Sequence, residues 1–163
     1  MNDLQLLTMR DKVNVFEDFA RTLAKVDLKD IGNVNEPVQT ELLTEHFFSP
    51  GIYTRVLHIP KGCMLTGKIH KEPILNIMLK GDISVLLGDN VVRVVAPFMC
   101  VSPAGSKKIG YAHEDTIWVG CHGTDETDVA KIESRFVAQD EQEWIEHVGK
   151  LRMRQISSMM KGA

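Results

Sequence analysis

Apolar residues change their spacing twice along the 163-residue chain, and these changes divide it into three parts. Between residues 11 and 26 they recur every three or four positions, which predicts an amphipathic helix that Asp11 can cap. Its apolar stripe consists of Val13, Phe16, Phe19, Ala20, Leu23 and Val26. A segment rich in glycine, asparagine and proline ends the pattern, so residues 1–40 are interpreted as a helix and a connecting loop.

Residues 41–123 carry short runs of β-branched residues instead, separated by turn-forming residues. A tight hairpin is indicated where Gly88, Asp89 and Asn90 join two such runs. Because no helical pattern interrupts them, the runs favour a β-barrel or sandwich over a parallel sheet. The predicted strands cover residues 41–48, 52–59, 64–70, 74–79, 82–87, 90–96, 98–103, 107–113 and 116–122.

Helical spacing returns in residues 124–163. A short helix is predicted over 126–136, capped by Thr124 or Asp125, and a longer one over 140–161. The apolar side of the longer helix consists of Trp144, Val148, Leu151, Gln155 and Met159, with Ile145, Ile156 and Met160 beside them. We expect these helices to pack on the barrel or on a partner subunit, since methionine-rich faces adapt to partner surfaces.

The composition gives no support for a nucleic-acid or a membrane partner. A net charge of -3 gives no argument for a nucleic-acid partner. The apolar runs are too short for a membrane span, and the N-terminus lacks the pattern of a secretory signal peptide. Cys63, Cys100 and Cys121 form no CxxC pair, which is typical of reduced thiols. We therefore expect a cytoplasmic protein with neither a nucleic-acid nor a membrane partner.

The stretch from Gly62 to Gly123 carries two short motifs. Their positions are occupied by Gly67, His70, Glu72, Asn76 and Gly81, and by Pro103, Gly105 and Lys108. In these motifs the chain resembles the cupin superfamily, in which two histidines, a glutamate and a further histidine hold a divalent metal in the barrel mouth. The resemblance implies a mainly β fold, a cupin-like jelly-roll β-barrel, commonly assembled into dimers or larger oligomers.

The metal ligands of that family are only partly present in this chain. The four ligand positions are occupied by His70, Glu72, Asn76 and Lys108. Of the four ligands in the family pattern, this chain keeps only His70. Lysine carries a positive charge and no acceptor, so Lys108 repels a cation, and an asparagine oxygen is a weak ligand. We expect no resident cofactor and at most a weakly bound divalent metal, with His70, Glu72 and His113 as candidate ligands.

The same positions suit an anion in the barrel mouth. Lys108 and His70 would bind it, Asn76 would donate a hydrogen bond, and Glu72 would orient Lys108. Tyr111 is included in this candidate pocket, although a rim position is the simpler interpretation. Alternatively, Lys108 and Glu72 form an internal ion pair that fills the barrel. The sequence leaves both interpretations open and assigns no catalytic residue.

A second resemblance covers residues 62–137 and is carried by the segments 111–118 and 122–128. They resemble short cupin-like proteins encoded in tailed-phage genomes, which implies an accessory or virion-associated protein in the host cytoplasm or the virion. The hypothesis is therefore a non-catalytic homo-oligomer that binds other virion proteins or a small anionic ligand. The alternative is a metal-dependent cupin enzyme of the dioxygenase or isomerase class.

Overall fold

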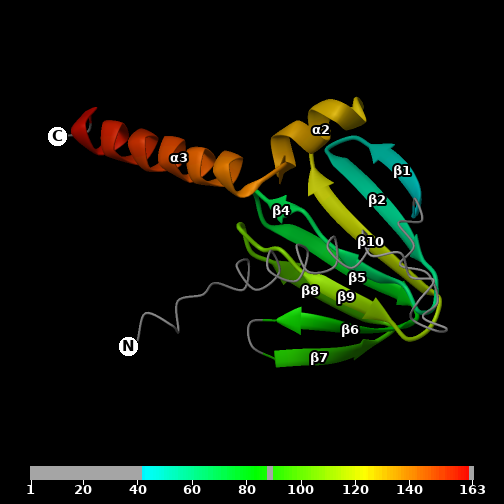
Figure 1. Cartoon of the computed structure of the whole chain (residues 1–163). Helices are drawn as coiled ribbons and strands as arrows, with labels where there is room; N and C mark the ends of the chain where they lie inside the picture. The colour runs from blue at the N-terminus through cyan, green and yellow to red at the C-terminus, as the bar shows by residue number, and fades with distance from the viewer. Residues whose placement is uncertain (1–41, 88–89, 162–163) are drawn as a thin grey trace, which may run out of the picture.

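The computed structural model describes residues 42–87 and 90–161 (Figure 1). The predicted helix at 11–26 and the centre of the predicted hairpin, residues 88–89, lie outside the described residues. The strands are β1 (Leu43–Ser49), β2 (Ile52–Ile59), β3 (Met64–Thr66), β4 (Ile69–His70), β5 (Ile74–Lys80), β6 (Asp82–Leu87), β7 (Asn90–Val95), β8 (Phe98–Ser102), β9 (Ile109–Ala112), β10 (Thr116–Gly123) and β11 (Val137–Ala138). The helices are α2 (Val129–Phe136) and α3 (Glu141–Lys161).

Two antiparallel sheets enclose the core. One has the strand order β1-β2-β10-β5-β8 and the other β3-β9-β6-β7. The main cluster of buried side chains draws on both sheets and consists of Ile59, Met78, Ile83, Val85, Val94 and Ala112. In β5 the buried side chains are alternate residues, Ile74, Asn76 and Met78, as the period of two predicts. The predicted mainly β fold class with C-terminal helices is confirmed.

The predicted strand at 64–70 is two strands in the structure. β3 pairs with β9, whereas β4 pairs with the two-residue strand β11, which the sequence did not indicate. The break falls at Gly67, whose backbone N–H donates to the Lys108 carbonyl at 2.8 Å. This crossing places His70 of β4 and Lys108, which precedes β9, on the same end of the barrel.

The cap predicted for α2 was wrong by a few residues. Asp128 caps the helix, accepting hydrogen bonds from the backbone N–H groups of Ala130 and Lys131 at 2.9 and 3.3 Å. Asp125 instead accepts from the Gly51 N–H at 2.7 Å and so joins the preceding segment to the β1–β2 turn. α2 packs its buried Ile132 and Phe136 against Tyr53, which closes this end of the barrel.

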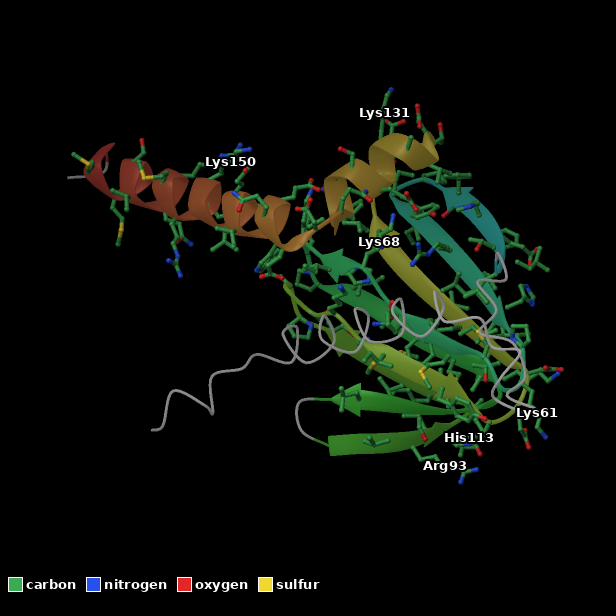
Figure 2. The ribbon with its side chains drawn as sticks, in the orientation of Figure 1. Lys61, Lys68, Arg93, His113, Lys131 and Lys150 are labelled. Carbon is green, nitrogen blue, oxygen red and sulfur yellow. The ribbon has the colours of Figure 1, made fainter. Side chains whose placement is uncertain are left out.

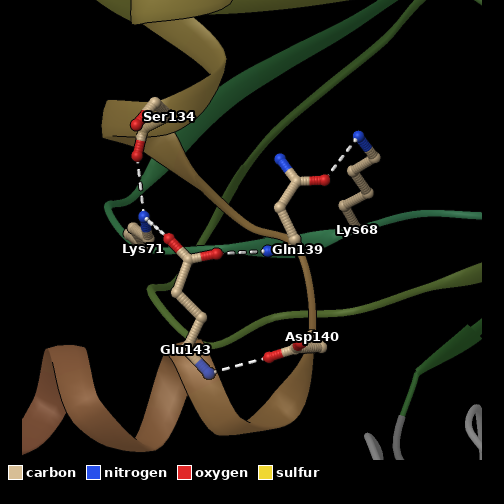
Figure 3. A network of polar contacts seen from close by, with 6 residues as sticks. All are labelled: Lys68, Lys71, Ser134, Gln139, Asp140 and Glu143. Carbon is tan, nitrogen blue, oxygen red and sulfur yellow. Dashed lines mark hydrogen bonds and ion pairs between the residues drawn. The ribbon is translucent and has the colours of Figure 1, made fainter.

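α3 is held to the barrel only through its first turns and then extends away from it (Figure 1). Its anchor is a polar network around Lys71, which is 8% exposed (Figure 3). The Lys71 ammonium donates to Glu143 Oε1 at 2.5 Å and to the Ser134 carbonyl at 2.7 Å, and Glu143 Oε2 accepts from the Gln139 N–H at 2.8 Å. Residues 150–160 of α3 are exposed. The network therefore fixes where α3 begins, while residues 150–160 bury no side chain against the described part of the barrel.

Replacing Glu143 by glutamine should lower the free energy of unfolding by about 1–3 kcal/mol, because it leaves the buried Lys71 ammonium without a carboxylate. The loss is smaller than for a fully buried pair, since the Glu143 side chain is 37% exposed. Urea unfolding followed by circular dichroism measures it. Glu146→Gln is the matched control, because Glu146 is exposed and accepts only from Gln142 within the same helix. Equal stabilities of the two variants would contradict this role of Glu143.

Candidate functional site

A cavity of about 100 Å³ lies inside the barrel between the two sheets. Its polar lining residues are Arg55, Lys68, His70, Asn76, Ser106 and Lys108. Its apolar lining includes Leu57, Ile59, Leu65, Ile83, Val85 and Trp118. The structure thus brings three of the predicted site residues, His70, Asn76 and Lys108, to one cavity.

Lys108 is a half-buried cation in the lining of this cavity. Its ammonium donates to Ser102 Oγ and lies 5.6 Å from the centre of the Trp118 ring. Burial lowers the pKa of Lys108, because the folded barrel disfavours its charged form. Among the described residues no carboxylate forms an ion pair with Lys108. The cavity therefore contains a positive charge that the described part of the protein does not neutralise.

The side-chain amide of Asn76 forms hydrogen bonds within the protein, so its NH₂ group is already engaged. Its amide NH₂ group donates to Ser102 Oγ at 2.8 Å and to the Ile74 carbonyl at 3.1 Å. Its Oδ1 accepts from Trp118 Nε1 at 3.0 Å. These bonds use both donors of the amide, so the expected hydrogen bond from Asn76 to a ligand would require one of them to break. The residue instead holds Ser102 and Trp118 in place beside Lys108.

His70 and Ser106 both line the cavity, and each has a buried polar atom without a partner among the described residues. These atoms are His70 Nδ1 and Ser106 Oγ, for which the part of the chain that the structure describes supplies no hydrogen bond. Burial, and to a smaller extent the neighbouring His122, lowers the pKa of His70 to about 4, so the imidazole is neutral at neutral pH. A buried polar atom left unsatisfied costs free energy. A polar ligand that reaches both atoms would remove that cost.

Two further cations of the lining, Arg55 and Lys68, were missed by the sequence reasoning. Arg55 Nη1 and Lys68 Nζ each lie 3.9 Å from a carboxylate oxygen of Glu133 on α2. Figure 2 shows Lys68 beside α2. Lys68 also donates to Gln139 Oε1 at 3.1 Å. The sequence contained a signal for Arg55, since it alternates with the inward residues Tyr53, Leu57 and Ile59 of β2.

Three other candidates lie elsewhere. The Glu72 carboxylate is 3.6 Å from Arg135 Nε, so the expected ion pair between Glu72 and Lys108 is not formed, and neither is the barrel plug built on it. Tyr111 is exposed and contacts the edge of the His113 ring. His113 Nε2 lies 2.7 Å from Ser84 Oγ, at the end of the barrel opposite Lys68 (Figure 2). Glu72 leaves the interior because β4 ends at His70, which interrupts the alternation that the sequence implied.

The residues that face the cavity do not form a good site for a divalent metal. They offer one imidazole, an amide oxygen already engaged with Trp118, and ammonium groups that repel a cation. In the part of the chain that the structure describes, no three His, Cys, Asp or Glu side chains group together as ligands. His70, Glu72 and His113 also lie too far apart in the fold to act as one ligand set, since each has separate neighbours.

Purified protein should accordingly contain well under one equivalent of Fe, Mn, Ni or Zn. The reason is the donor chemistry around His70, where Lys108 stands in place of a ligand. Elemental analysis of protein prepared without chelator makes the measurement, with His70→Ala as the comparison. A stoichiometric metal content that disappears in His70→Ala would contradict this interpretation.

No protein-family model matches the sequence, and no curated protein matches it significantly. Similar solved structures include KdgF from a Halomonas species, with 13% identity over 62% of this chain and 95% of that chain and a TM-score of 0.47. A cupin superfamily protein from Desulfitobacterium hafniense has 13% identity over 56% and 84% of the two chains, with a TM-score of 0.45. An acetylacetone dioxygenase from Acinetobacter johnsonii has 16% identity over 60% and 72%, with a TM-score of 0.44.

Among the similar structures, one is described as a cupin superfamily protein, one as a cupin-2 domain containing protein and one by its double-stranded beta-helix domain. They include an enzyme and proteins described only by their superfamily, and at these identities they say nothing about activity. The phage resemblance has no counterpart in the three structures named above. None of the helices in the described ranges combines the length and apolar composition of a membrane span. The function must therefore be argued from the cavity itself.

Proposed function

We propose that this chain is a binding protein whose barrel cavity takes up a small anion. The observation that carries the proposal is Lys108, a cation inside the barrel with no carboxylate partner among the described residues. Two residues that line the same cavity, His70 and Ser106, each have a buried polar atom without a hydrogen-bond partner in the described ranges. Burying an unneutralised charge and unsatisfied polar atoms lowers the free energy of unfolding. Groups of this kind are characteristic of binding sites.

Titration calorimetry with butyrate and with its neutral amide, butyramide, tests this function. Both molecules have similar size, so a difference in affinity reports the charge. Butyrate should bind with one site per chain, and butyramide should bind at least tenfold more weakly. Equal affinities, or no heat with either molecule, would overturn the proposal of an anion site.

A second role, self-association through α3, is supported by a separate observation. The helix leaves exposed apolar side chains beyond the edge of the barrel: Ile145, Leu151, Met153, Ile156, Met159 and Met160. Its first half carries Glu141, Glu143 and Glu146, whereas its second half carries Lys150, Arg152 and Arg154. An antiparallel pair of such helices places the acidic half of each beside the basic half of the other. The occupant we propose is a second copy of this chain, and virion partners remain a prediction of the phage resemblance.

Deleting residues 150–163 should lower the oligomeric state while the β-structure persists. The cut falls after Lys71, Glu143 and Trp144, so the anchor of α3 stays intact, and residues 150–160 contribute no buried side chain to the barrel. Light scattering gives the mass per assembly, and circular dichroism gives the strand content. An unchanged mass would contradict the role of α3 in assembly.

A further inference from the structure

The walls of the cavity differ in chemistry, and this difference specifies the ligand more closely. His70, Ser106 and Lys108 contribute the polar atoms, and Ser106 and Lys108 follow one another closely in the segment before β9. The aliphatic lining residues come from β2 of one sheet and β6 of the other: Leu57, Ile59, Ile83 and Val85. None of the lining residues that the structure describes is an aspartate or a glutamate. The cavity thus suits a molecule with one anionic end and one apolar end.

The charges around the cavity indicate a single negative charge on the ligand. Arg55 and Lys68 share the Glu133 carboxylate, and the Lys68 side chain is 52% exposed, so water also solvates it. His70 is neutral at neutral pH because burial lowers its pKa to about 4. Lys108 is then the one enclosed lining charge that neither a carboxylate nor open solvent compensates within the described residues. One enclosed cation matches a monoanion better than a dianion, whose second charge would be desolvated without a partner.

The polar and the aliphatic lining residues together indicate a ligand with a carboxylate group and an apolar chain. A carboxylate accepts hydrogen bonds at both oxygens, so it can take one from the Lys108 ammonium and one from the Ser106 hydroxyl or a His70 N–H. The aliphatic wall stabilises an apolar body and offers nothing to a phosphate or sulfate ion. The volume of about 100 Å³ compares with about 10–15 Å³ that one water needs by this measure, so the cavity holds a molecule of several heavy atoms.

We infer that the ligand is a short-chain monocarboxylic acid, bound with its carboxylate at Lys108 and Ser106 and its hydrocarbon body against Leu57, Ile59, Ile83 and Val85. This inference rests on the proposed anion-binding function and narrows it to one chemical class. It also assigns a role to Ser106, which no sequence motif marked. Ser106 Oγ is buried and has no hydrogen-bond partner in residues 42–87 and 90–161, as expected of a hydroxyl that binds a ligand.

The test is a calorimetric titration of the full chain with acetate, butyrate, hexanoate, succinate and inorganic phosphate at constant ionic strength. Each buried CH₂ contributes about 0.8 kcal/mol, or roughly a fourfold gain in affinity. Butyrate should therefore bind about 15-fold more tightly than acetate, and both succinate and phosphate should bind more weakly than butyrate. Ser106→Ala should weaken butyrate binding by at least threefold, whereas Lys61→Ala, at an exposed turn outside the lining, should not change it.

Each contrary result has a distinct meaning. If acetate, butyrate and phosphate bind equally, the anion site stands but the assignment to monocarboxylic acids is overturned. If succinate or phosphate binds more tightly than butyrate, the single-charge argument is wrong. If none of the five anions binds, the inference is overturned together with the proposed function. If Ser106→Ala binds butyrate as the wild type does, the placement of the carboxylate beside Ser106 is wrong.

Discussion

Replacing Lys108 by methionine is expected to weaken butyrate binding by about 10- to 150-fold without destabilising the barrel. A hydrogen bond to a charged group contributes about 1.5–3 kcal/mol, which corresponds to that range of affinity. Methionine keeps most of the side-chain volume beside Trp118 and removes only the charge. The loss of binding should therefore come from the ammonium and not from a changed cavity.

The stability of the same variant distinguishes a binding residue from a structural one. Because burial lowers the pKa of Lys108, the protonated side chain costs stability at neutral pH, and removing it should leave the free energy of unfolding unchanged or higher. Stability from urea unfolding and affinity from calorimetry should be measured together, with Lys61→Met as the matched control for the substitution. A Lys108→Met protein that unfolds more readily, or that binds butyrate normally, would contradict the assigned role.

Acidification is expected to destabilise the protein strongly between about pH 6.5 and pH 4. Burial is the main cause that lowers the pKa of both His70 and His122 to about 4, and their ring centres lie 5.9 Å apart. In the unfolded chain both imidazoles bind protons below about pH 6.5. Since the unfolded state then holds more protons than the folded one, stability present above pH 6.5 is lost as the pH falls towards 4.

The free energy of unfolding should fall by at most about 3.4 kcal/mol for each imidazole, because the pKa falls from 6.5 to about 4. Urea unfolding at about pH 7 and about pH 4.5 measures it. His122→Gln should lose less stability on acidification than the wild type, whereas His147→Gln, on α3 outside the barrel, should behave as the wild type does. The same pH dependence in wild type and His122→Gln would show that His122 does not contribute.

Alternation of apolar and polar residues was enough to place most strands. β2, β6 and β10 begin and end within a residue of their predicted limits, because each keeps one face towards the core along its whole length. The alternation fails at residues 64–72, where the chain passes from one sheet to another at Gly67. That crossing depends on a hydrogen bond to Lys108, which is distant in the sequence, so no local pattern could show it.

The residues of the candidate site were likewise only partly predictable from the sequence. His70 and Lys108 could be found because they stand in motifs with a characteristic spacing, whereas Glu72 follows the end of a strand whose length the sequence did not reveal. Ser106 has no distinguishing pattern, and only its burial without a partner draws notice to it. Lys71 is buried because its partner Glu143 comes from α3, 72 positions further along the chain, so no local pattern could show it.

The most direct measurement of the central claim is a crystal structure of the full chain grown with butyrate. The account predicts the butyrate carboxylate within hydrogen-bond distance, about 3 Å, of Lys108 Nζ and its propyl chain against Ile59 and Ile83. A neighbouring hydrogen bond from Ser106 Oγ should be visible in the same map. A cavity that holds only water at saturating butyrate, or a metal ion bound at His70, would contradict the account.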